Sequence, residues 1–125
     1  MTATIQKEIS LSHENLKSIL QTGSLCSYVW CSELRYKINK DVPVEKTLIS
    51  VEECDEDFDA PIKTHNITGL DVEKAVAILF TYPRKTNAAL MVKDFINNEY
   101  DACYLDAEAC DVILQIATFK DVVYG

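Results

Sequence analysis

Residues 62–83, IKTHNITGLDVEKAVAILFTYP, decide the fold, because the spacing of their apolar side chains changes partway along. Ile62 to Ile67 alternates only modestly between apolar and polar residues and predicts a strand, whereas the residues that follow are apolar at helical spacing. Thr68 and Asp71 form a capping signature that opens this helix. Pro83 ends it, because proline cannot continue the helical hydrogen bonds. Its expected buried side comprises Leu70, Val72, Val76, Ile78 and Leu79.

The residues before this stretch predict one helix and two strands. Ser12 as N-cap and Gly23 as a left-handed C-terminal residue define an amphipathic helix at about 13–22. Residues 25–38 interleave aromatic and β-branched side chains with polar ones, and residues 47–51 are β-rich, so the two segments are expected to pair as a hairpin. One face of the first strand would carry Cys26, Tyr28 and Trp30.

The residues after it predict two more helices and a docked tail. Thr86 can cap a helix that Asn97 and Asn98 close, and Asp106 can cap another. The apolar tail at 122–125 is expected to pack rather than fray. The order predicts a single α+β domain over residues 1–125, with a small antiparallel sheet of about three strands and about four helices packed on it.

Composition and charge restrict the classes of partner. The chain has 125 residues and a net charge of -8, and residues 52–125 carry fifteen acids against six basic residues. This balance argues against binding nucleic acid or an anionic membrane, because both need basic side chains. No apolar run approaches the roughly 20 residues of a membrane span, and the N-terminus lacks the apolar core of a secretory signal. We therefore expect a cytoplasmic protein.

The motifs of catalysis, metal binding and phosphate binding are not found. Cys26 and Cys31 are the nearest approach to a zinc pair, but no second pair accompanies them. An EF-hand loop starting at Asp55 would need glycine and glutamate where Ala60 and Asn66 stand. Five cysteines, an odd number, predict buried thiols rather than disulfides. We expect no enzyme activity, no catalytic residues, no metal and no cofactor.

The densest charged feature is an acidic segment with six acids in eight residues. It could bind a cation, or it could mimic a DNA backbone and bind a host protein. It could also be a solvated hairpin end that keeps the protein soluble. The residues concerned are Glu52, Glu53, Asp55, Glu56, Asp57 and Asp59.

Two aromatic and basic features predict a site for a small anionic ligand such as a nucleotide. Stacking rings and a cation could come from the first strand, although core and rim packing is the alternative role for the same rings. A second contribution could come from basic residues at a helix N-terminus, where a bound anion would relieve the conflict with the helix dipole. The candidate ligand-binding residues are Tyr28, Trp30, Arg35, Tyr36, Arg84, Lys85 and Thr86.

The C-terminal residues 105–125, LDAEACDVILQIATFKDVVYG, resemble the ending of a group of small phage and bacterial proteins without an assigned activity. Their tails read approximately D-A-E-x-A-D-x-[IV]-[VL]-Q-x-A-x-F-G-[ED]-[VI]-V-Y-G. The segment from Gly23 to Glu33 resembles their G-x-G-x-W-A-S-E stretch, without the glycines before Trp30, and Lys120 replaces their usual glycine. The resemblance implies a small phage accessory protein acting in counter-defence inside the host cell.

Two functional hypotheses follow. In the first, a non-enzymatic protein, expected to be a homo-oligomer, sequesters a small anionic ligand, in particular a nucleotide signal of host defence. In the second, an acidic inhibitor or DNA mimic binds a host defence protein through residues 52–59. The first depends on the aromatic and basic residues, and the second depends on the acidic segment.

Overall fold

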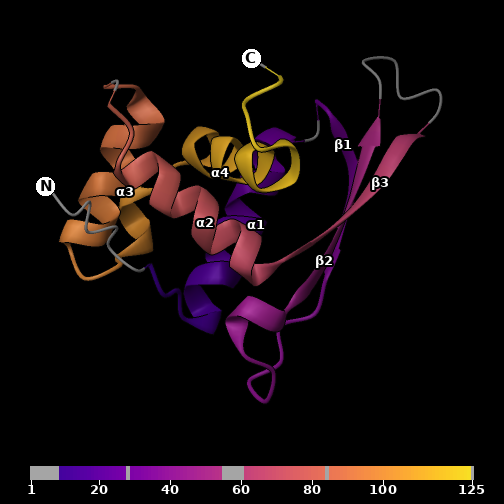
Figure 1. Ribbon diagram of the computed structural model, residues 1–125, viewed down its shortest axis with the longest axis horizontal. Helices are drawn as coiled ribbons and strands as arrows, with labels where there is room; N and C mark the ends of the chain where they lie inside the picture. Colours follow the sequence, from indigo (N-terminus) through magenta and orange to yellow (C-terminus); the bar gives the residue numbers. More distant parts are fainter. Residues whose placement is uncertain (1–8, 28, 55–60, 84, 125) are drawn as a thin grey trace, which may run out of the picture.

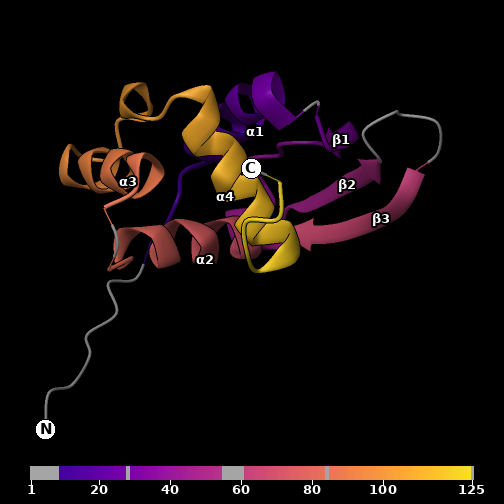
Figure 2. The same ribbon diagram turned by 90° about the horizontal axis from the view of Figure 1, so that it is seen from above.

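The computed structural model describes residues 9–27, 29–54, 61–83 and 85–124. Over these residues the chain forms four α-helices and a three-stranded antiparallel sheet of order β1-β2-β3, which confirms the predicted α+β class. The sheet stands beside the helices, and α4 crosses the helical part of the molecule (Figure 1, Figure 2). The elements are α1 His13–Ser27, β1 Cys31–Tyr36, η1 Val44–Lys46, β2 Leu48–Cys54, β3 Pro61–Thr68, α2 Gly69–Phe80, α3 Asn87–Asn97, η2 Ala102–Tyr104 and α4 Ala107–Phe119.

Helix α1 is longer than predicted, because Gly23 does not end it. Gly23 is buried within the helix, where a β-carbon would lie 2.7 Å from Leu114 Cδ1 and 3.3 Å from Cys110 Cβ of α4. The glycine therefore permits close approach of two helices instead of a left-handed turn. Cys26 belongs to α1, so it does not share a strand face with Trp30, as the sequence had predicted.

The sheet has one face toward the helices and one toward solvent. Directly opposed residues of antiparallel strands share a face, and successive residues alternate between faces. Tyr36, Ile49 and Ile67 form one row across the sheet, and Ile49 and Ile67 are buried. The neighbouring row of Arg35, Ser50 and Asn66 therefore lies on the solvent face.

Several predicted helix ends are confirmed. Thr68 and Asp71 form the capping box of α2, and the backbone N–H of Ala89 donates to Thr86 Oγ1 at 3.2 Å to cap α3. Asp106 Oδ1 accepts from the N–H of Ala109 at 2.7 Å and caps α4. These short-range signals were readable in the sequence because each depends on residues only three positions apart.

Helix α4 contacts α1, α2, α3 and β3, so it is the central element of the core. It ends at Lys120, whose φ of 66° is the left-handed conformation that glycine adopts without strain. Among the described residues, no helix is both long enough and apolar enough to cross a membrane.

Candidate functional site

The described residues of the predicted aromatic and basic strand do not share one surface. Trp30 precedes β1 and is only 1% exposed. Its ring stacks on Tyr124 with centroids 5.8 Å apart and meets the Phe119 ring edge to face at 5.3 Å. Trp30 therefore has the core role that was the alternative reading. Tyr28 lies outside the described residues.

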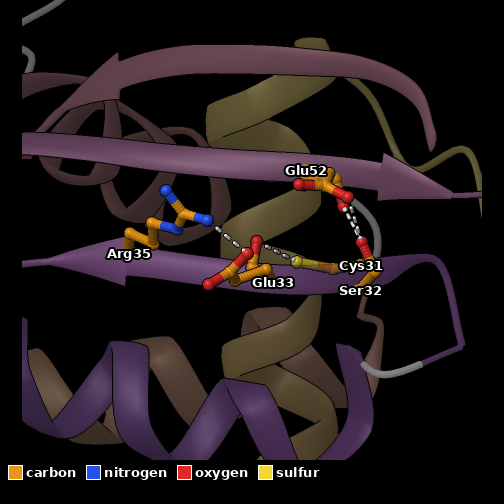
Figure 3. A network of polar contacts seen from close by, with 5 residues as sticks. All are labelled: Cys31, Ser32, Glu33, Arg35 and Glu52. Atoms are coloured by element: carbon orange, nitrogen blue, oxygen red, sulfur yellow. Dashed lines mark hydrogen bonds and ion pairs between the residues drawn. The ribbon is translucent and has the colours of Figure 1, made fainter.

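Tyr36 and Arg35 point to opposite faces of the sheet, since they are adjacent on β1. The Arg35 guanidinium donates to Glu33 Oε2 at 2.8 Å on the solvent face (Figure 3). Beside this pair, Ser32 Oγ donates to Glu52 Oε1 at 3.0 Å. The cation that was expected to meet a ligand is thus engaged by a carboxylate of its own strand, away from both aromatic rings.

The thiol of Cys31 lies beside this group but turns toward the core. Its Sγ donates to the backbone oxygen of Glu33 at 3.2 Å (Figure 3). Burial raises the pKa of the Cys31 thiol to about 11, so the thiol stays protonated at neutral pH. A protonated, buried thiol is a poor nucleophile and a poor metal ligand.

The acidic segment is described only at Glu52 and Glu53, because Asp55, Glu56, Asp57 and Asp59 lie outside the described residues. Glu53 Oε1 accepts from His65 Nε2 at 2.8 Å, and Glu53 Oε2 accepts from the Tyr124 hydroxyl at 2.5 Å. The Glu53 side chain is only 13% exposed. Glu53 is therefore part of an internal network rather than of a partner-binding surface, whereas Glu52 remains on the solvent face.

The groups around Glu53 favour the charged form of its carboxyl group. Burial raises the pKa of the Glu53 carboxyl, but the hydrogen bonds from Tyr124 and His65, with the charges of His65 and Lys63, together lower it by more. The resulting pKa lies below the ordinary glutamate value. The His65 side chain is largely covered, and its ring meets Phe119 edge to face at 5.1 Å.

A second part of the network is organised by Asp111 of α4. Asp111 Oδ1 accepts from Ser27 Oγ at 2.7 Å and from Trp30 Nε1 at 2.8 Å. Asp111 Oδ2 accepts from Gln115 Nε2 at 2.9 Å. We call this side of α4 the tail network; its members are Ser27, Trp30, Glu53, His65, Asp111, Gln115, Phe119 and Tyr124.

Gln115 fixes the C-terminal tail within the tail network. Its side chain is fully buried, and its Oε1 accepts from the backbone N–H groups of Val123 and Tyr124 at 3.0 and 2.8 Å. Its Nε2 also donates to the carbonyl of Tyr124 at 2.8 Å. The predicted docking of the tail is confirmed at Tyr124. Val123 stays 57% exposed.

The other side of α4 borders a cavity of about 450 Å³ between α2, α3 and α4. This volume is within the roughly 300–1,000 Å³ of small-molecule sites. Ile78 and Val122 are 43% and 44% exposed at its edge, so apolar surface continues out to solvent. The apolar lining consists of Ile78, Leu79, Ala88, Met91, Ala109, Val112, Ile116 and Val122.

One predicted ligand-binding residue borders the cavity. Thr86 lines it next to Asn87, but the Thr86 hydroxyl caps α3. Lys85 is exposed one residue earlier, and Arg84 lies outside the described residues. The anion site predicted at residues 84–86 therefore stays a prediction, and it would lie at the edge of the cavity.

No three His, Cys, Asp or Glu side chains within the described ranges gather closely enough to hold a metal ion. Comparison with protein-family models, with curated proteins and with solved structures gave no match. The chain's own geometry therefore has to carry any functional assignment.

Proposed function

We propose that this protein is a non-catalytic binding protein that holds a small molecule with an apolar body in the cavity between α2, α3 and α4. The observation that carries the proposal is a cavity of about 450 Å³ with a mainly apolar lining and an exposed apolar edge. Burying an apolar ligand there would gain roughly 25 cal/mol per Å² of apolar surface removed from water. Sequestration of such a molecule fits the accessory role that the phage-like tail implies.

A hydrogen-bonded group of acid and base side chains, Glu53, His65 and Tyr124, lies outside the cavity. The two carboxylate oxygens of Glu53 each accept a hydrogen bond from one of the other two residues. None of the three lines the cavity, so they are not placed to act on a ligand bound there. The acids that do line the cavity, Asp106, Glu108 and Asp121, are exposed.

Backbone amide NMR with a panel of apolar fragments and nucleotides tests the proposal. We expect shift changes from apolar fragments to concentrate at the cavity-lining residues of α2, α3 and α4. Ala88→Leu should fill part of the cavity and weaken these changes. Ala107→Leu, half-buried at the start of α4 and outside the cavity lining, is the matched control.

Two outcomes would contradict the proposal. If no fragment or nucleotide shifts the lining residues, the cavity is not a binding site. If Ala88→Leu and Ala107→Leu bind equally well, the fragments occupy another surface. Shifts that are caused by nucleotides and centred on Lys85 and Thr86 would instead support the anionic ligand predicted from the sequence.

A further inference from the structure

The polar groups that line the cavity are unevenly distributed along α4. Asp106 and Glu108 stand at the start of the helix, and Lys120 and Asp121 follow its end. Because α4 has 13 residues and rises about 1.5 Å per residue, the two ends are about 20 Å apart. The cavity is therefore an elongated apolar groove with different charges at its two ends.

The lining near Lys120 and Asp121 contains one cation and one acid. Lys120 and Asp121 carry opposite charges, and Lys120 Nζ also donates to Asp71 Oδ1 at 3.2 Å. Asp71 belongs to the first turn of α2 and does not line the cavity. This end offers no excess charge to a ligand from the described lining.

The end at the start of α4 carries an excess of negative charge. Asp106 and Glu108 contribute two carboxylates there, and both side chains are exposed. The positive end of the α4 dipole is worth only about half an elementary charge, so it does not cancel them. Lys85, which precedes the lining residue Thr86, does not itself line the cavity.

The same lining includes an aromatic ring. Tyr82, just after α2, lines the cavity and is half-buried. Lys93 donates from Nζ to the Tyr82 carbonyl oxygen at 3.3 Å, so this lysine is engaged at the backbone and is not part of the lining. An aromatic face together with carboxylates is the usual environment for an organic ammonium group.

We propose that the ligand of this groove is an elongated amphiphile with an ammonium group, whose cation lies by Asp106 and Glu108 and whose apolar body lies along α4. This inference rests on the proposed binding function. It assigns a ligand charge opposite to that predicted from residues 84–86, because the described lining has acids where an anion would need cations.

Calorimetry with three octyl compounds tests the ligand class. Octyltrimethylammonium, octanol and octyl sulfate share the apolar chain and differ in charge. We expect the ammonium compound to bind about three- to tenfold more tightly than octanol, since exposed ion pairs contribute roughly 0.2–1 kcal/mol each. Added salt should reduce this preference. Octyl sulfate should bind most weakly.

Paired variants locate the cation. Glu108→Gln should lower the preference for ammonium over octanol about threefold and leave octanol binding unchanged. Asp121→Asn, at the other end of the same groove, is the matched control and should change the preference less. Both side chains are exposed, so neither change should disturb folding.

The outcomes separate the two proposals. If none of the three compounds binds, the binding function itself fails. If they bind with equal affinity, or octyl sulfate binds most tightly, the groove binds apolar ligands but the ammonium assignment is wrong. A larger effect of Asp121→Asn than of Glu108→Gln would also overturn it, because the cation would then lie at the other end.

Discussion

The two sides of α4 differ in how completely they are filled. On the side of the tail network, both carboxylate oxygens of Asp111 and both polar atoms of the Gln115 amide are hydrogen-bonded. The rings of Phe119 and Tyr124 cover Trp30. On the other side, Val112 and Ile116 border open volume. One helix therefore carries both a closed structural unit and an open groove.

This difference between the two sides indicates which part of the chain to test for function. A buried polar network needs particular donors and acceptors, because an unsatisfied buried group costs about 1–3 kcal/mol. A groove for an apolar body needs only shape and apolar walls. Asp111, Gln115, Phe119 and Tyr124 belong to the phage-like tail pattern and all lie in the tail network. The most specific part of that pattern thus accounts for folding.

Replacing Trp30 of the tail network with alanine should give the largest loss of stability. The result would test whether the two sides of α4 differ in packing. Trp30→Ala is expected to lower the free energy of unfolding by about 3–5 kcal/mol, since it removes a buried ring and leaves a cavity. Val112→Ala, on the groove side, should cost about 1 kcal/mol or less, because Val112 is half-buried beside open volume. Urea unfolding followed by circular dichroism measures both. Equal losses would mean that the two sides are packed alike.

Removing the carboxylate of Asp111 should give the next largest loss of stability. Asp111→Ala leaves Trp30 Nε1 and one N–H of Gln115 Nε2 without their acceptor, while Ser27 Oγ keeps the Gly23 carbonyl, and should cost about 2–3 kcal/mol. Asp94→Ala, an exposed acid of α3, is the control and should stay within about 0.5 kcal/mol of wild type. A loss at Asp111 no greater than at Asp94 would show that water replaces the network.

Lowering the pH should weaken the hydrogen bonds that Glu53 accepts in the tail network. Because the folded pKa of Glu53 lies below its unfolded value, its stabilising contribution is present above the unfolded pKa and is lost as the pH falls through the folded pKa. A double-mutant cycle of Glu53→Gln and Tyr124→Phe should give a coupling of about 1 kcal/mol at neutral pH. The coupling should shrink at acidic pH. A coupling that is absent at neutral pH would contradict the contact.

The smallest effect is expected where α4 passes into the tail. Lys120→Gly should raise the free energy of unfolding by roughly 0.5–1 kcal/mol, because glycine adopts a positive φ without strain and the exposed pair with Asp71 contributes little. Lys120→Ala removes the same ion pair but keeps a β-carbon, so it should not stabilise. Thermal unfolding distinguishes the two. Equal melting temperatures of the two variants would show that the positive φ of Lys120 costs no measurable stability.

Much of the fold was readable from the sequence, and the reasons are local. The caps at Thr68, Thr86 and Asp106 each depend on a contact within three residues. Gly23 was misread because its role is close contact with Leu114, 91 positions away, which no local pattern encodes. The same reading extended the first strand back over residues 25–30, of which Leu25, Cys26 and Ser27 belong to α1.

The candidate site was less predictable than the fold. Ile78, Leu79 and Ile116 are apolar at helical spacing, and such spacing marks a buried side without showing whether that side is filled. Leu70 and Ile78, both expected on the buried side of α2, are 41% and 43% exposed. Near the start of α4, the residue singled out from the sequence was Asp106, and it was predicted as a helix cap.

The placement of Trp30 has a spectroscopic consequence. Trp30 is the single tryptophan, it is 1% exposed, and its indole N–H donates to a carboxylate while its ring stacks on Tyr124. Its emission should be blue-shifted in the native state and should move to the red when the tail undocks. Because Trp30 does not line the groove, a ligand that enters the groove should leave this emission almost unchanged. The chain thus contains an optical reporter for one side of α4 only.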